Sequence, residues 1–179
     1  MITRLKQTNE KVLHLAHHDA LTELPNRTLF YDRLNQAIAK ARRDKELIAV
    51  LYMDLDGFKL INDTLGHDAG DALLRETAKR VVACVRESDT VARMGGDEFT
   101  VILCNARTPR SIDLVARKII DAIASPFLIN GKSCSVSISI GISLYPNNGE
   151  TPDQLVKIAD ATMYSAKQSG KNCYRTAGS

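Results

Sequence analysis

Two short apolar runs joined by a pair of glycines constrain this chain more than any other feature. Residues 90–94 and 99–103 are largely apolar and predict two strands. Gly95 and Gly96 lie between them and predict a hairpin, because glycine adopts positive φ and lets another molecule approach closely. Asp97 and Glu98 add two negative charges at the tip. Such a turn suits a metal-bound polyphosphate, but at this point an ordinary solvated turn fits equally well.

A second acidic pair follows the most apolar segment of the chain. Residues 47–53 predict a strand that is buried on both faces, and Asp54 and Asp56 follow it. If Asp54 faces the hairpin, it forms a cluster of hard oxygen ligands with Asp97 and Glu98. The mutual repulsion of these carboxylates would be offset by a divalent cation such as Mg²⁺. The alternative is that Asp54 and Asp56 only cap the next helix.

The remaining pattern predicts a mixed α/β (α+β) fold with an antiparallel hairpin at its centre. Apolar residues recur at helical spacing in four segments, 28–43, 71–86, 109–124 and 152–168. Further strands are predicted at 127–129 and 134–136, around an Asn130-Gly131 turn, and at 135–143 and 173–175.

Size and composition limit the class of protein. A chain of 179 residues with 44% hydrophobic residues predicts one globular domain. A net charge of +3 with scattered basic residues gives no support for nucleic-acid binding. No apolar run is long enough for a transmembrane helix, so we expect no membrane contact by this domain. The four cysteines lack metal-ligand spacing and predict buried free thiols, which together with the absence of an export signal favours the cytoplasm.

Several ordered segments resemble the motifs of the GGDEF domain family, the diguanylate cyclases of bacteria. The segments are His18–Arg27, Asp54–Asp63, Gly66–Asp71, Gly95–Phe99, and Ala159–Lys167 followed by Gly170–Asn172. The resemblance runs from about residue 17 to residue 175. It implies a palm-like nucleotidyl-cyclase fold, with a central mixed sheet flanked by helices and the signature hairpin at its centre.

The resemblance also implies an activity and a metal centre. Members of the family join two GTP molecules into cyclic di-GMP and release two pyrophosphates. Two Mg²⁺ ions, or Mn²⁺, would be held by Asp54, the carbonyl of Leu55 and Glu98, with Asp97 bridging. Asp97 and Glu98 would thus be the catalytic acids, while Gly95 and Gly96 form the signature turn.

Other positions match the nucleotide-binding motifs of the family. The N–H groups of Gly57 and Phe58 at a helix start would bind phosphate. Lys59, Lys167 and Lys171 would supply positive charge. Without the resemblance, the last two are better explained as solvated residues at a helix end. Asn62 and Asp71 match the guanine-binding pair. A helix N-cap after Gly70 is the alternative for Asp71.

One further segment resembles a regulatory motif. Arg86 and Asp89, five residues before the hairpin, match an inhibitory RxxD site for the product cyclic di-GMP. Arg117 is a candidate second contact. The alternative is a charged helix end and turn.

Residues 1–16 differ in kind from the domain at 17–179. Ile2, Leu5, Asn9, Val12 and Ala16 form a short heptad seam, read either as the remnant of a signalling helix or linker, or as a frayed lead-in. The resemblance implies catalysis by a homodimer. It also implies attachment to sensory or phosphodiesterase domains, in a protein that could be membrane-anchored with this part in the cytoplasm. The alternative function is a non-catalytic sensor of GTP or cyclic di-GMP that regulates a partner domain.

Overall fold

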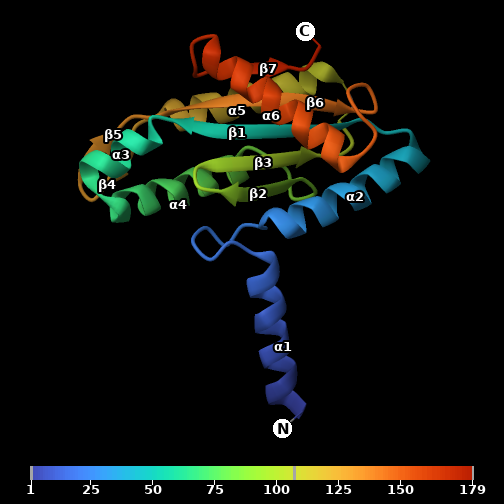
Figure 1. Cartoon of the computed structure of the whole chain (residues 1–179), viewed down its shortest axis with the longest axis horizontal. Helices are drawn as coiled ribbons and strands as arrows, with labels where there is room; N and C mark the ends of the chain where they lie inside the picture. The colour runs from blue at the N-terminus through green and yellow to red at the C-terminus, as the bar shows by residue number, and fades with distance from the viewer. Residues whose placement is uncertain (1, 107, 179) are drawn as a thin grey trace.

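The computed structural model describes residues 2–106 and 108–178, which form six helices and seven strands (Figure 1). In chain order these are α1 (Ile2–His17), α2 (Arg27–Asp44), β1 (Ile48–Asp56), α3 (Phe58–Leu65), α4 (His67–Ala83), β2 (Thr90–Gly95), β3 (Glu98–Leu103), α5 (Pro109–Ala124), β4 (Phe127–Ile129), β5 (Lys132–Cys134), β6 (Ser137–Tyr145), α6 (Pro152–Gln168) and β7 (Tyr174–Thr176).

The main sheet has the strand order β2-β3-β1-β6-β7, and only the β6–β7 pair is parallel. β1 lies at its centre and is paired on both sides. Alternate β1 residues point to opposite faces, and each face has its own core. Leu51 and Met53 pack with α4 and α5, whereas Val50 and Tyr52 pack with α2 and α6. The predicted mixed α/β fold is confirmed.

Several boundaries differ from those predicted. β5 starts at Lys132, because Asn130 and Gly131 both adopt positive φ and make a turn that pairs Ile129 directly with Lys132. β6 begins at Ser137, and β7 begins one residue later than expected. β1 continues through Asp56, because β6 pairs with it along its full length.

The acids therefore lie within β1 and not in a capping position. The residue that caps α3 is Gly57, which has positive φ and makes no side-chain capping bond. The helix predicted at 71–86 starts four residues earlier than expected: α4 begins at His67, directly after its cap residue Gly66, and ends at Ala83. Asp71 is thus inside α4, so the alternative that it is an N-cap is wrong.

Close backbone packing places α6 against the sheet. A Cβ on Gly141 of β6 would overlap the backbone of Ala159 and Met163, so only glycine allows this approach. On the other face, Arg80 of α4 donates to the carbonyls of Ala122 at 2.8 Å, Ser125 at 2.8 Å and Pro126 at 3.0 Å. These bonds satisfy the free C-terminal end of α5.

α1 projects away from the domain in Figure 1 and has no buried residue. The loop after it is fixed to the sheet edge through Arg93 of β2. Its guanidinium contacts the Asp19 carboxylate at 3.0 Å, and its backbone N–H donates to Pro25 O at 3.0 Å.

No helix among the described residues has the length and apolarity to cross a membrane. The four cysteines are free, and Cys104 and Cys173 are only partly buried.

Candidate active site

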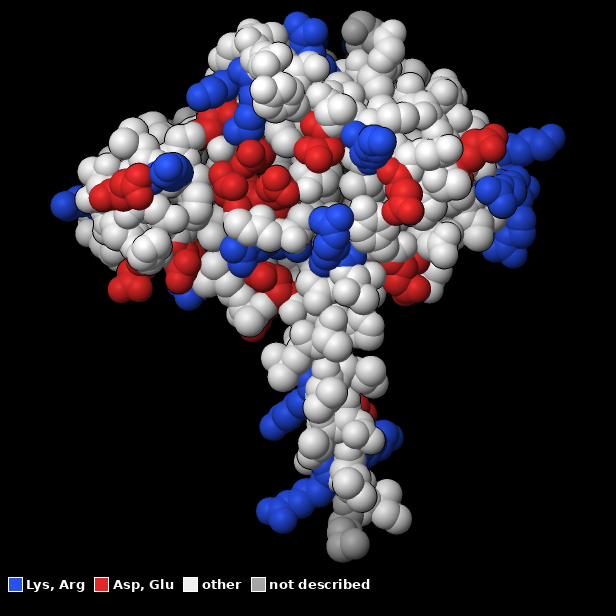
Figure 2. All heavy atoms as spheres, viewed as in Figure 1, with Lys and Arg blue, Asp and Glu red and all other residues white. Residues whose placement is uncertain are grey.

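The register of the central strands brings the predicted acids together. Asp54 of β1 lies directly opposite Glu98 of β3, so both side chains leave the same face of the sheet. The backbone N–H of Leu55 donates to the carbonyl of Asp97 at 3.3 Å, which holds the turn formed by residues 95–98 against the end of β1. Figure 2 shows acidic side chains gathered on this face, with Lys and Arg side chains beside them.

Asp54 is partly buried and has a raised pKa. Burial raises its pKa to about 7, with further contributions from the hydrogen bond and the negative charge of Asp97. Its Oδ1 atom is buried and has no hydrogen-bond partner within the described part of the chain. A buried carboxylate oxygen without a partner is unfavourable, and a cation at this position would compensate it.

Lys167 of α6 supplies the nearest positive charge. Its ammonium lies 3.3 Å from Asp54 Oδ2 and 3.4 Å from the carbonyl oxygen of Leu55. Burial by itself lowers the pKa of Lys167, but the charges and hydrogen bonds of Asp54 and Asp56 outweigh this effect and raise it. The side chain therefore remains a cation beside the oxygens that the sequence predicts as metal ligands.

Asp56 has a function that the sequence did not indicate. Its carboxylate accepts from Ser137 Oγ at 2.6 Å, Ser139 Oγ at 2.8 Å and the backbone N–H of Asn172 at 3.1 Å, and it contacts Lys167 Nζ at 3.2 Å. Burial opposes its ionisation, but these four donors together lower the pKa of Asp56. Asp56 therefore joins the ends of β1, β6 and α6 and anchors the lysine.

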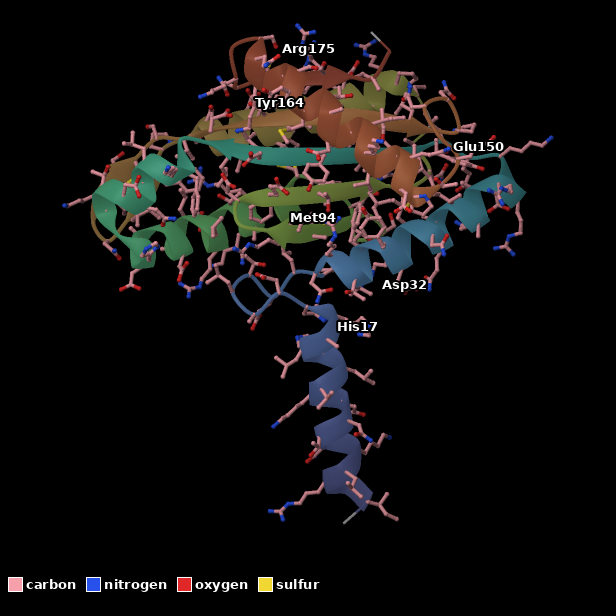
Figure 3. The ribbon with its side chains drawn as sticks, in the orientation of Figure 1. His17, Asp32, Met94, Glu150, Tyr164 and Arg175 are labelled. Carbon is pink, nitrogen blue, oxygen red and sulfur yellow. The ribbon has the colours of Figure 1, made fainter. Side chains whose placement is uncertain are left out.

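Glu98 is held by a second unexpected residue. The hydroxyl of Tyr52, which is 4% exposed, donates to Glu98 Oε2 at 2.6 Å. Burial, followed by the hydrogen bond and charge of Glu98, raises the pKa of Tyr52. Met94, labelled in Figure 3, is the residue before the last one of β2 and packs against the core between α2, α6 and the sheet.

The donor set fits Mg²⁺. In the described ranges no three His, Cys, Asp or Glu side chains form a ligand cage by themselves. Mg²⁺ does not need one, since it takes one or two carboxylates and completes its octahedron with water and substrate phosphate. Asp54, Glu98 and Asp97 supply carboxylates of this kind, and the Leu55 carbonyl, which already accepts from the Lys167 ammonium, faces the same space.

The predicted phosphate ligands lie around the start of α3 and the end of α6. Gly57 adopts φ 85° and turns the chain into α3, where Phe58 and Lys59 are the first residues. Lys59 and Lys171 are exposed. Lys171 has positive φ, and its N–H donates to Ala166 O at 3.2 Å, so it follows the end of α6 directly.

The predicted guanine-binding pair is brought together by α3 and α4. A Cβ on Gly70 would overlap the Asn62 carboxamide, so Asn62 lies against the residue that precedes Asp71. Both side chains are partly buried. Across residues 2–106 and 108–178, neither polar group has a protein partner. They are therefore available to a ligand.

The predicted inhibitory residues are only partly brought together. Arg86 and Asp89 line a cleft of about 350 Å³, but Arg117 is not among its lining residues and donates to Tyr174 Oη at 3.4 Å instead. Asp89 accepts from the backbone N–H groups of Arg86 at 2.9 Å and Cys104 at 3.1 Å, so it also shapes the turn. The Arg86 side chain is 67% exposed.

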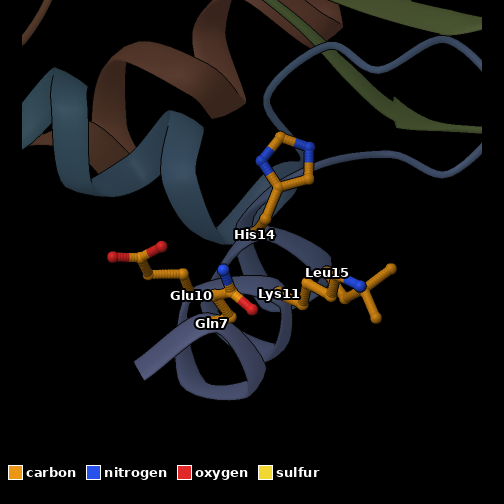
Figure 4. Close-up of a pocket in the computed structure, with 5 residues that line it drawn as sticks. All are labelled: Gln7, Glu10, Lys11, His14 and Leu15. Atoms are coloured by element: carbon orange, nitrogen blue, oxygen red, sulfur yellow. The ribbon is translucent and has the colours of Figure 1, made fainter. Parts of the chain in front are cut away.

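A second hollow, of about 690 Å³, lies beside α1 (Figure 4). Its lining residues are Gln7, Glu10, Lys11, His14 and Leu15, all from one helix. With no facing wall it does not resemble a small-molecule site. Next to it the rings of His14 and His18 stack at 4.0 Å, while His17 Nδ1 lies 2.9 Å from Leu13 O. His17 and His18 thus bond to backbone carbonyl groups in the last turns of α1.

Comparison with known proteins identifies relatives of this arrangement. The model of the family described as "Diguanylate cyclase, GGDEF domain" matches residues 16–173. The bifunctional diguanylate cyclase/cyclic di-GMP phosphodiesterase MucR of Pseudomonas aeruginosa is 50% identical over 174 residues. The diguanylate cyclase TpbB of the same species is 45% identical over 175 residues. The chain covers only 25% of MucR and 40% of TpbB, although each match includes 97% of the chain.

Solved structures agree. The GGDEF domain of TpbB superposes with a TM-score of 0.88 at 44% identity, covering 90% of this chain and 94% of that one. The coiled coil and GGDEF domain of DgcB from Caulobacter crescentus, solved in complex with c-di-GMP, gives 0.89 at 28% identity, covering 98% and 93%. From the family match, the relatives and the shared fold, it follows that this chain belongs to the GGDEF domain family of diguanylate cyclases.

Proposed function

We propose that this domain condenses two GTP molecules into cyclic di-GMP and two pyrophosphates. The observation that carries the proposal is the placement of Asp54 opposite Glu98, with the Asp97 turn closed over Leu55. This arrangement gathers the predicted metal ligands at one end of the central strand. Two relatives that are named as diguanylate cyclases, MucR and TpbB, match 97% of this chain.

Asp54, Asp97, Glu98 and the Leu55 carbonyl would hold the metal ions. Bound Mg²⁺ would neutralise phosphate charge and lower the pKa of the attacking 3′-hydroxyl. The N–H groups of Gly57 and Phe58 and the ammonium of Lys167 would orient the phosphates.

Asn62 and Asp71 would select guanine. A carboxylate accepts from guanine N1–H and the 2-amino group together, whereas adenine offers neither donor. Because an unsatisfied buried acceptor is costly, this contact discriminates strongly. Asp71→Ala should reduce the preference for GTP over ATP in competition binding, and an unchanged preference would exclude this role.

Catalysis would require two copies of the domain. Each holds one GTP, and each 3′-hydroxyl attacks the α-phosphate of the nucleotide on the other copy. The exposed apolar residues of α1, among them Ile2, Leu5 and Val12, are suited to pairing with a second copy.

Product would inhibit the enzyme through the Arg86 cleft. The exposed Arg86 guanidinium can form paired hydrogen bonds with a guanine or a phosphate. Asp89 would help to shape the site, and Arg117 does not line this cleft. We expect Arg86→Ala to relieve inhibition by added cyclic di-GMP; equal inhibition of variant and wild type would exclude the site.

Product analysis tests the main proposal. The protein at high concentration is incubated with GTP and Mg²⁺, with ATP in a parallel reaction, and the products are identified by mass spectrometry. We expect cyclic di-GMP from GTP alone, and none from Glu98→Ala. A wild type that binds GTP or cyclic di-GMP but forms no product would contradict the proposal.

That result would favour the second candidate, a non-catalytic sensor. Two relatives at 35% and 36% identity are named cyclic di-GMP phosphodiesterases, NbdA of P. aeruginosa and PdeR of Escherichia coli. In such a protein a domain of this kind could report GTP or cyclic di-GMP to its neighbour. The intact acid set of Asp54, Asp97 and Glu98 favours catalysis.

A further inference from the structure

A buried tyrosine hydroxyl contacts one of the proposed metal ligands. Tyr52 lies on β1, is 4% exposed, and donates to Glu98 Oε2 at 2.6 Å. This distance is typical of a charge-assisted O–H···O⁻ bond, which is stronger than a neutral one. In the part of the chain that the structure describes, no other group donates to the Glu98 carboxylate.

The strand register explains why the two side chains meet. Tyr52 precedes Asp54 by two residues, so both point to the same face of the sheet. Glu98 is paired with Asp54, and Tyr52 with Thr100, which makes Tyr52 and Glu98 diagonal neighbours. A long aromatic side chain spans this separation. β1 is hydrogen-bonded on both sides, by β3 and β6, so the backbone that carries the Tyr52 side chain is held in place.

The hydroxyl is the informative part of this side chain. A phenylalanine would fill the same space between α2 and α6, where Tyr52 belongs to the apolar core. The hydroxyl adds one hydrogen bond, made to one oxygen of Glu98, and leaves the other oxygen available to a cation. Groups that bond to metal ligands in this way fix their orientation, and their loss typically lowers metal affinity.

We propose that Tyr52 is a positioning residue, which orients Glu98 for metal binding. The inference rests on the proposed function, because it assumes that Glu98 holds Mg²⁺. It predicts that the hydroxyl acts on metal affinity through Glu98 alone.

Metal binding to Tyr52→Phe tests the inference without turnover. The probe is Mn²⁺, whose free concentration is followed by electron paramagnetic resonance. The protein is saturated with a GTP analogue that carries a methylene bridge between the α- and β-phosphorus atoms. Tyr145→Phe serves as matched control, because Tyr145 is a buried tyrosine of the neighbouring strand β6 with 6% exposure. Thermal unfolding of each variant shows whether the fold is intact.

We expect Tyr52→Phe to raise the Kd for Mn²⁺ roughly 10- to 100-fold, and Tyr145→Phe to leave it unchanged. In a Glu98→Ala background, Tyr52→Phe should have no further effect, since the hydroxyl then has no carboxylate to orient. A Kd of Tyr52→Phe within twofold of wild type, or an equal loss in both backgrounds, would overturn the inference while leaving the proposed function intact. A wild type that binds the analogue but no Mn²⁺ would overturn both.

Discussion

Replacing Asp54 with asparagine should change the stability of the domain in a way that depends on pH. The stability of the variant relative to wild type should be higher at alkaline pH than at acidic pH. Burial and the neighbouring Asp97 raise the pKa of Asp54 from 3.8 to about 7. An acid with a higher pKa in the folded chain binds more protons when folded. Its favourable contribution is therefore complete below pH 3.8 and is lost as the pH rises towards 7. Asparagine does not ionise, so the variant does not lose stability in this way as the pH rises.

The magnitude follows from the pKa. The span from 3.8 to about 7 corresponds to at most about 4 kcal/mol. The Asp54 side chain is 20% exposed, and the surrounding water screens part of this energy, so we expect about 1–3 kcal/mol. For a domain of this size that difference is a shift in Tm of about 3–10 °C.

The assay is thermal unfolding by circular dichroism at pH 4.5 and pH 8, with EDTA present. We expect the Tm of Asp54→Asn, measured relative to the Tm of wild type, to be higher at pH 8 than at pH 4.5. Asp56→Asn is the control of opposite sign: the pKa of Asp56 is lowered, so its contribution is present at neutral pH and lost on acidification. A difference between Asp54→Asn and wild type that is equal at both pH values would refute the reasoning.

Three other substitutions test the packing around the site. Gly141→Ala should destabilise the domain by about 1–3 kcal/mol in urea unfolding, because the added Cβ meets the backbone of α6; wild-type stability would contradict that contact. Gly70→Ala should displace Asn62 and reduce the GTP-over-ATP affinity ratio about tenfold, near 1.4 kcal/mol, in competition binding. An unchanged ratio would show that Asn62 does not read the base. Arg80→Met should cost about 1–3 kcal/mol by leaving the carbonyls at the end of α5 unpaired, whereas the exposed Arg75→Met on the same helix should not.

Local sequence patterns were sufficient for most secondary structure. The helices at 109–124 and 152–168 have the predicted bounds, because a proline after a capping threonine defines each start. The glycine turn joins β2 to β3 as expected. The start of α4 at His67 was missed, because its first turn buries only the small residues Ala69 and Gly70, which add little to an apolar pattern.

The contacts between individual side chains at the site could not be predicted from the sequence. The Asp-x-Asp spacing does not show how the surroundings of the two acids differ, but in the structure Asp54 has an unpartnered oxygen and a raised pKa, whereas Asp56 has four donors and a lowered pKa. Asp54 and Asp56 are two residues apart on β1, so both side chains point to the same face of the sheet. The difference arises from the serines of β6, which only the β1–β6 register places beside Asp56.

The sequence by itself therefore determined the elements of this domain, the glycine turn and the chemical kinds of ligand available, because periodicity and turn chemistry act over a few neighbouring residues. Only the tertiary structure decided which groups meet. Tyr52 and Glu98 are 46 positions apart, and Asp56 and Lys167 are 111 apart. Contacts at such separations depend on strand register and on how closely α6 packs against β6, and no local pattern encodes either of them.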